Sequence, residues 1–223
     1  GITAENVANQ FHVSRAEQDE FALESHRRAV AAIKAGKFTD EILPVELKDR
    51  KGNVTVFDTD EGPRDGLTIE KLAKLRPAFI KGGSVTAGNS SSLNDGAAAV
   101  VLMSRKRAEE LGVIPKLKVE GFAVAGVEPE IMGYAPKLSS EKLAKQLGIG
   151  LTEIDMFEIN EAFASQAYAV RRDLGLDAKK VNIYGGGISI GHPIGATGCM
   201  LTVKVLYELI RTNKKDAMIS MCI

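Results

Sequence analysis

The chain has 223 residues, 44% of them hydrophobic, which is enough for one large domain or two modest ones around a sizeable core. Its 29 basic and 29 acidic residues cancel, and no basic cluster carries interleaved aromatic residues, so we exclude nucleic acid and an anionic membrane surface as partners. No apolar run approaches a membrane span, and we expect no signal peptide. Two cysteines are too few for a disulfide framework and lack the spacing of zinc ligands, so we expect a reducing, cytoplasmic location and no metal.

Both ends of the sequence resemble internal positions of a longer chain. The first residue is Gly1, and the apolar stretch 216–223 stops without a turn or a polar tail. Termini normally lie at a solvated surface. We therefore expect the chain to be part of a longer protein.

Capping and turn residues predict the elements of the first half. Ser14 and Glu17 form an S-x-x-E capping box, which predicts a long helix after Ser14. Thr68 and Ser104 are expected to cap two shorter helices. The stretch 41–58 predicts two strands around a Lys-Gly turn. The region before residue 90 is irregular and predicts an appended or inserted subdomain.

The second half alternates strand patterns with helix patterns. A continuous apolar run at 97–104 is typical of a strand covered on both faces. Further strands are expected at 116–127, 154–159, 180–185 and 216–223, and helices at 139–147, 160–176 and 195–212. Such alternation predicts an α/β layered fold.

A glycine-rich loop, GGGISIGHPIGATG at 185–198, lies between a predicted strand and a predicted helix and contains His192. It lacks both the G-x-G-x-x-G register and the lysine of a phosphate-binding loop. Ligands gather at strand ends in α/β sheets, and glycine permits a close approach of the backbone. Two interpretations of His192 stay open on the residues alone: a catalytic imidazole, or one hydrogen-bonded within the loop for structural reasons.

Other candidate residues also allow a structural interpretation. Asn160 follows a predicted strand, where it could cap the next helix with Glu161 at the helix dipole, or donate toward a developing oxyanion. Cys222 and Cys199 are each consistent with a packed, inert thiol. The other histidines have no partner motif and are expected at surface or core positions.

Four motifs in this order and spacing closely resemble the thiolases, the acetyl-CoA C-acetyltransferases: TAGNSSSLNDGAAAVVLMS, NEAFA, GHPIGATG and a strand that ends in MCI. GITAENVA and KLRPAF add to the resemblance, which covers essentially the whole chain. It implies a layered α-β-α-β-α fold, incomplete here and with part of an inserted loop subdomain. The implied divisions are 1–92 for the loop subdomain, 93–115 for the end of the N-terminal half and 116–223 for the C-terminal half without its last residues.

The resemblance also implies the chemistry of three side chains. His192 matches the histidine that takes the proton from a nucleophilic cysteine, and Cys222 matches the second cysteine, which removes or returns an α-proton. Asn160 matches the asparagine that holds an oxyanion-hole water, with the His192 ring as the other donor. The implied reaction is a reversible Claisen condensation, or its reverse thiolysis, between acetyl-CoA and acetoacetyl-CoA or another 3-ketoacyl-CoA.

Coenzyme A thioesters are the implied substrates, with no permanently bound cofactor. The resemblance places Arg64 near the nucleotide phosphates and Ser91 against the pantetheine arm. The implied apolar walls are Phe79, Leu93, Met132 and Phe163. A homodimer or homotetramer is implied as the assembly, together with the missing N-terminal segment of the same protein.

Two departures from the family pattern affect this interpretation. The nucleophilic cysteine of the family lies upstream of GITAEN, and its glycine-rich end follows MCI, so we expect this chain alone to be inactive. Tyr184 stands where the family commonly has asparagine. An alternative is a truncated, non-catalytic module that binds coenzyme A or serves assembly. A ketoacyl-carrier-protein synthase is disfavoured by Cys222, and a dinucleotide-binding dehydrogenase by the failed glycine register.

Overall fold

The structure is a computed structural model that describes residues 1–223. In chain order the helices and strands are α1 (Ile2–Gln10), α2 (Arg15–Lys34), β1 (Val45–Lys48), β2 (Val54–Phe57), α3 (Ile69–Ala73), α4 (Arg105–Glu110), η1 (Pro129–Tyr134), α5 (Ala135–Leu147), η2 (Leu151–Glu153), β3 (Met156–Ile159), α6 (Ala164–Asp173), α7 (Gly187–Ile190), α8 (Thr197–Thr212) and β4 (Ala217–Ser220). None of the helices has the length and apolar character that crossing a membrane requires.

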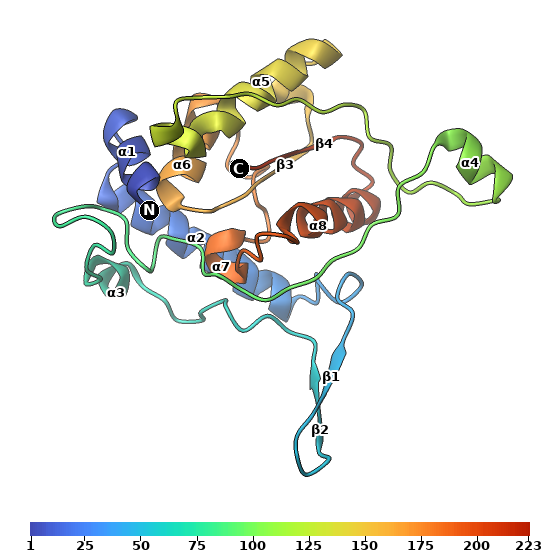
Figure 1. The fold of residues 1–223 in the computed structure, drawn as a ribbon, viewed down its shortest axis with the longest axis horizontal. Coiled ribbons are helices and arrows are strands. Elements are labelled where there is room, and N and C mark those ends of the chain that lie inside the picture. The colour runs from blue at the N-terminus through green and yellow to red at the C-terminus, as the bar shows by residue number, and fades with distance from the viewer.

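The strands β3 and β4 form a parallel pair that is covered by helices on both faces (Figure 1). Successive side chains of a strand point to opposite faces. Phe157 and Met218 therefore join one core, which contains residues of α6 and is flanked by Leu143 of α5. Met156 faces the other way and packs against Val205 of α8 and its neighbours. The result is a helix–strand–helix sandwich in which both faces of a short sheet are buried.

Local signals place the helices of the first half as predicted. The Ser14 side chain accepts from the Glu17 backbone, and the Glu17 carboxylate accepts from the Ser14 backbone, which confirms the capping box at the start of α2. Thr68 caps α3 and Ser104 caps α4, as predicted. Helix α2 packs against α6 and against α7, the short helix inside the glycine loop, so it also positions that loop.

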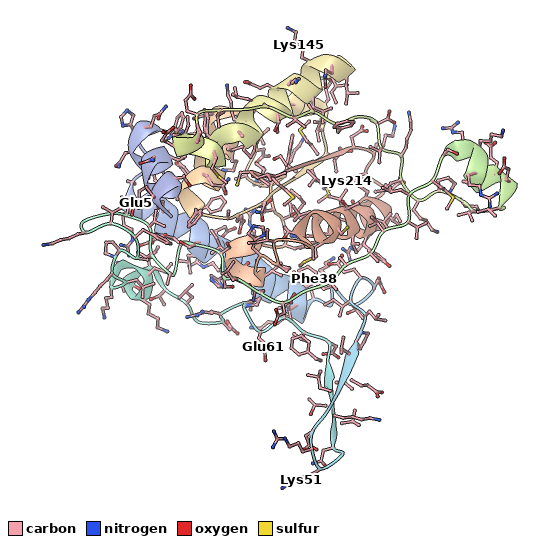
Figure 2. All side chains as sticks on the ribbon, in the orientation of Figure 1. Glu5, Phe38, Lys51, Glu61, Lys145 and Lys214 are labelled. Carbon is pink, nitrogen blue, oxygen red and sulfur yellow. The ribbon has the colours of Figure 1, made fainter.

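The predicted strands at 41–58 form an antiparallel hairpin, β1–β2, that projects away from the body of the molecule (Figure 1). Every residue of both strands is exposed. Side chains of the hairpin stand free on both sides in Figure 2, with Lys51 at its tip.

Three predicted strands are corrected by the structure. The apolar run 97–104 and the alternating stretch 116–127 have no strand conformation and are largely exposed. They belong to a long segment that runs around the edge of the molecule and carries α4 (Figure 1). The stretch 180–185 forms only isolated bridges, one of them to β3. A strand requires a hydrogen-bonded neighbour, and none lies beside 97–104 or 116–127 in this chain.

Candidate active site

Asn160 lies at the carboxyl end of β3 and does not cap a helix. Its backbone N–H donates to the carbonyl of Ser220 (2.9 Å), which continues the pairing of β3 with β4. Helix α6 begins at Ala164, and its N-cap is Phe163. The alternative of a helix-capping Asn160 is therefore wrong, because three residues separate it from the helix. Asn160 is 1% exposed, and its side-chain oxygen has no hydrogen-bond partner.

The glycine loop brings the His192 ring to Asn160. Asn160 Nδ2 lies 3.3 Å from His192 Nε2, and the other ring nitrogen, Nδ1, lies 2.7 Å from Thr197 Oγ1. Burial lowers the pKa of His192, so the ring is neutral at neutral pH. Two residues 32 positions apart in the sequence thus meet through polar atoms at a strand end.

Two glycines of the loop are required by close approach. A Cβ at Gly191 would lie 2.4 Å from Asn94 Oδ1, and its φ of 108° is rarely adopted by other residues. A Cβ at Gly186 would lie 2.4 Å from the carboxyl carbon of Glu161. The glycines therefore let the His192 loop pack directly on its neighbours.

The serine-rich loop holds the backbone of His192 from the other side. The His192 N–H points at the carbonyl of Ser92 (3.2 Å) and at Asn94 Oδ1 (3.3 Å). The same loop runs along the segment after Asn160, where the Ser91 N–H donates to the carbonyl of Ala162 (2.9 Å). Three of the four sequence motifs are thereby joined by hydrogen bonds.

Glu161 is a buried carboxyl group next to Asn160, and it does not lie at the start of α6, which begins at Ala164. It accepts from Ser25 Oγ (2.6 Å), from Asn182 Nδ2 (2.8 Å) and from the Ile188 N–H (3.3 Å). Burial raises its pKa, and these hydrogen bonds oppose the rise. The contacts fix the strand end, α2 and α7 to one another.

Cys222 lies two residues beyond the end of β4 and is half-buried. Burial raises the pKa of its thiol, so the group is protonated at neutral pH. No hydrogen bond joins Cys222 to His192 or Asn160, although all three lie at strand ends or on the loop beside them. Cys199 lies in the first turn of α8 and is also half-buried and unpaired.

Some of the residues implied for coenzyme A lie together, and others stand apart. The rings of Phe79 and Phe163 meet edge to face at 6.1 Å, and Phe163 forms a bridge with Ser90, the neighbour of Ser91. Leu93 is 83% exposed and Met132 half-buried in η1; no hydrogen bond or ring contact joins either to the phenylalanine pair.

Arg64 lines a cavity of about 220 Å³ between α2 and residues 64–67. Its backbone N–H donates to His26 Nδ1 (3.1 Å), while its guanidinium has no hydrogen-bond partner. Arg27, Lys34 and Asp65 line the same cavity, and Lys34 Nζ pairs with Asp65 Oδ2 (2.6 Å), so the charge available to a phosphate there is that of Arg27 and Arg64. A second cavity, of about 210 Å³, lies beside Arg171. Neither cavity is lined by His192, Asn160 or Cys222.

Sequence reasoning missed Thr197, Asn94 and Asn182 as parts of the site. Thr197 lies in the glycine-rich loop 185–198, and its position five residues after His192 is the one sequence feature that links it to the site. The other two contact the site through side-chain hydrogen bonds that span 98 and 23 positions, for which no local pattern exists.

The geometry defines an α/β protein whose polar side chains gather where a parallel strand pair ends. Residues 1–106 match the model of the thiolase N-terminal domain, and residues 113–223 match that of the thiolase C-terminal domain. The chain is 52% identical to an acetyl-CoA acetyltransferase of Pseudomonas aeruginosa and 54% identical to the beta-ketothiolase BktB of Cupriavidus necator. All of this chain aligns in both comparisons, but it spans only 57% of each relative.

Solved structures agree with these matches. The acetyl-CoA acetyltransferase of Bacillus anthracis superposes with a TM-score of 0.96 at 48% identity, over 100% of this chain and 56% of that one. Human mitochondrial 3-ketoacyl-CoA thiolase gives a TM-score of 0.92 at 40% identity, with the same coverage. The chain belongs to the thiolase family of acyltransferases, and its fold is the thiolase fold over the part that it spans.

Proposed function

We propose that the protein containing this chain catalyses reversible Claisen condensation and thiolysis between acetyl-CoA and acetoacetyl-CoA or another 3-ketoacyl-CoA. The observation that carries the proposal is the approach of Asn160 Nδ2 to His192 Nε2 at the carboxyl end of β3 (3.3 Å). Such an arrangement supplies a base and a polar group side by side, as acyl transfer through an enolate requires. The names of the relatives support the same reaction class.

His192 is the proposed base for a nucleophilic cysteine outside this chain. A neutral imidazole can take the thiol proton, and the resulting thiolate attacks the thioester carbonyl. Burial keeps His192 neutral, which suits this role. Asn160 is proposed to hold a water in the oxyanion hole that it shares with the His192 ring, which donates once it is protonated.

Cys222 is the proposed general acid and base for the α-carbon. Its raised pKa supplies a protonated thiol, which returns the α-proton in thiolysis. In condensation the thiolate form removes that proton. Coenzyme A is proposed to place its phosphates at Arg64 and its pantetheine arm along Ser91, with Phe79, Leu93, Met132 and Phe163 as apolar walls.

The proposed assembly is a cytoplasmic homodimer or homotetramer. Two unpaired cysteines support a reducing location.

The proposed divisions of the chain remain 1–92, 93–115 and 116–223. Helices α1 and α2 of the first division pack on α6 of the last, so contacts cross between these two divisions.

Thiolysis of acetoacetyl-CoA tests the proposal. The chain alone should give the background rate, and turnover should appear when the remaining segment of the parent protein is co-expressed with it. In that complex His192→Ala should lower kcat by roughly 10²–10⁴-fold and Asn160→Ala by roughly 10²–10³-fold. His12→Ala is the matched control at an exposed histidine and should leave turnover unchanged.

Two outcomes contradict the proposal. Robust turnover by the chain alone would refute a nucleophile outside it. A complex that binds coenzyme A in a calorimetric titration but stays inactive would support the alternative of a non-catalytic binding or assembly module.

A further inference from the structure

Thr197 carries a buried hydroxyl at the first position of α8, and both of its side-chain hydrogen-bond partners, His192 and Pro193, lie in the glycine loop. It is 3% exposed. Its Oγ1 lies 2.7 Å from His192 Nδ1 and 2.9 Å from the carbonyl oxygen of Pro193. Both partners precede Thr197 by five residues or fewer, so the loop and the helix start form one local unit.

Counting protons assigns a direction to each contact. The Pro193 carbonyl oxygen can only accept, and the backbone N–H groups of Ala196 (2.8 Å) and Thr197 (2.9 Å) already reach it. We assign the single Thr197 hydroxyl hydrogen to the same oxygen as a third donor. The Thr197 oxygen must then accept from His192, which places a hydrogen on Nδ1. In a neutral ring the other nitrogen, Nε2, is left with its lone pair.

The opposite face of the ring agrees with this assignment. Nε2 faces the Asn160 amide nitrogen, which can only donate, so Nε2 is the acceptor. Turning the Asn160 amide over would place its oxygen against Nε2, an arrangement that requires a hydrogen on Nε2 and therefore none on Nδ1 of a neutral ring. The loop backbone is also fixed, because the His192 N–H points at Ser92 and Asn94. Ring position and tautomer are therefore both determined by neighbours.

We propose that Thr197 is a positioning residue that holds His192 in the Nδ1–H tautomer, so that the unprotonated nitrogen, Nε2, is the one that faces Asn160. The mechanistic value of this tautomer rests on the proposed function, since a base must present an unprotonated nitrogen. The tautomer itself is a property of this chain and is measurable without any catalysis.

Two-bond ¹H–¹⁵N correlation spectra of the chain, recorded at about pH 8, well above the ordinary histidine pKa of about 6.5, test the inference. Only three histidines contribute signals. His192 should show Nδ1 at the shift of a protonated nitrogen and Nε2 at that of an unprotonated one. His26 should show the reverse pattern, because its Nδ1 accepts from the Arg64 N–H. Comparison with His192→Gln assigns the signals.

Thr197→Val and Thr197→Ser separate positioning from packing. The valine variant conserves shape but removes the acceptor, so the pure Nδ1–H pattern of His192 should be lost. The serine variant restores the hydroxyl and should restore the pattern. Unchanged His26 signals in either variant show that the fold is intact.

Three results would overturn the inference: an Nε2–H pattern in the unsubstituted chain, an unaltered pattern in folded Thr197→Val, or loss of the pattern in folded Thr197→Ser. The first of these needs no variant, so the inference can fail even if Thr197→Val does not fold. An inactive reconstituted protein with the expected tautomer would count against the proposed reaction and support the positioning role of Thr197.

Discussion

The buried side-chain amide of Asn182 forms the backbone hydrogen bonds at the end of β3 that a neighbouring strand would otherwise form. Its side chain accepts from the Ile159 N–H and donates to the Ile159 carbonyl and to Glu161 Oε1, each at 2.8 Å. Asn182 is therefore hydrogen-bonded to both sequence neighbours of Asn160, Ile159 and Glu161. It is 3% exposed and adopts a φ of 45°, a left-handed conformation that asparagine tolerates better than most residues.

Asn182→Asp should lower the free energy of unfolding by about 3 kcal/mol at neutral pH, because two donors are lost and a carboxylate is set against Glu161 and a carbonyl. Denaturant unfolding measures this. Asn213→Asp is the matched control, since Asn213 has a φ of 52° but is exposed at the end of α8, and it should cost less than about 1 kcal/mol. Equal costs for the two substitutions would contradict the assigned contacts.

His26 makes the fold sensitive to acid. Burial, with a smaller contribution from Arg64, lowers its pKa to about 4. The unfolded chain takes up this proton near pH 6.5 and the folded chain only near 4. Stability is therefore fully present above pH 6.5 and is lost as the pH falls toward 4.

His26→Gln should flatten this part of the stability profile by about 1–2 kcal/mol. Thermal melts at a series of pH values measure the effect. His12→Gln, at an exposed histidine, should leave the acid slope unchanged. A His26→Gln profile as steep as that of the unsubstituted chain would show that His26 does not carry the effect.

At the scale of elements, a buried ion pair ties α8 to β3. Lys204 Nζ lies 3.0 Å from Glu158 Oε2, and the two side chains are 8% and 1% exposed. Lys204 also donates to the carbonyl of Gly185, at the start of the glycine loop. Burial raises the pKa of Glu158, and the attraction of Lys204 opposes the rise. The pair therefore connects the helix after the loop to the strand before Asn160.

Lys204→Met should destabilise the fold by about 3 kcal/mol at neutral pH, because it leaves a carboxylate buried without a partner. The cost should shrink as the pH falls and Glu158 takes up a proton. Lys34→Met removes an exposed lysine of comparable geometry, paired with Asp65 at 67% and 70% exposure, and should cost less than about 1 kcal/mol. A pH-independent cost for Lys204→Met would show that packing, and not the uncompensated charge, is responsible.

Elements with local signals were predictable from the sequence, and those that depend on distant partners were not. The capping box of Ser14 and the turn of the β1–β2 hairpin are complete within a few residues. The run 97–104 carries the composition of a buried strand, but composition does not supply a neighbouring strand. In the site, the motif resemblance singled out Asn160 and His192, which the structure brings together. The motif resemblance did not indicate Asn182, because Asn182 supports the site only through the hydrogen bonds of its side chain to Ile159 and Glu161.

At the scale of the whole molecule, the long segment between the two halves leaves much apolar surface in solvent. Six large apolar side chains between residues 97 and 127 are more than 70% exposed: Val101, Leu102, Ile114, Val119, Phe122 and Val124. Soluble monomers rarely expose large contiguous apolar patches. The chain has a formal net charge of zero at pH 7, so charge repulsion does little to oppose contact between copies.

We therefore predict that the chain alone self-associates in the micromolar to millimolar range of concentration. Sedimentation measures the association, which should strengthen with sulfate because hydrophobic contacts do so. Replacing Leu102 and Phe122 together by serine should weaken it by about tenfold or more, since each removes an exposed side chain worth about 1.5–3 kcal/mol on full burial. Lys118→Ser, on the same segment, controls for a general effect of substitution. Association that weakens in sulfate, or that responds equally to Lys118→Ser, would assign it to charge and not to the apolar segment.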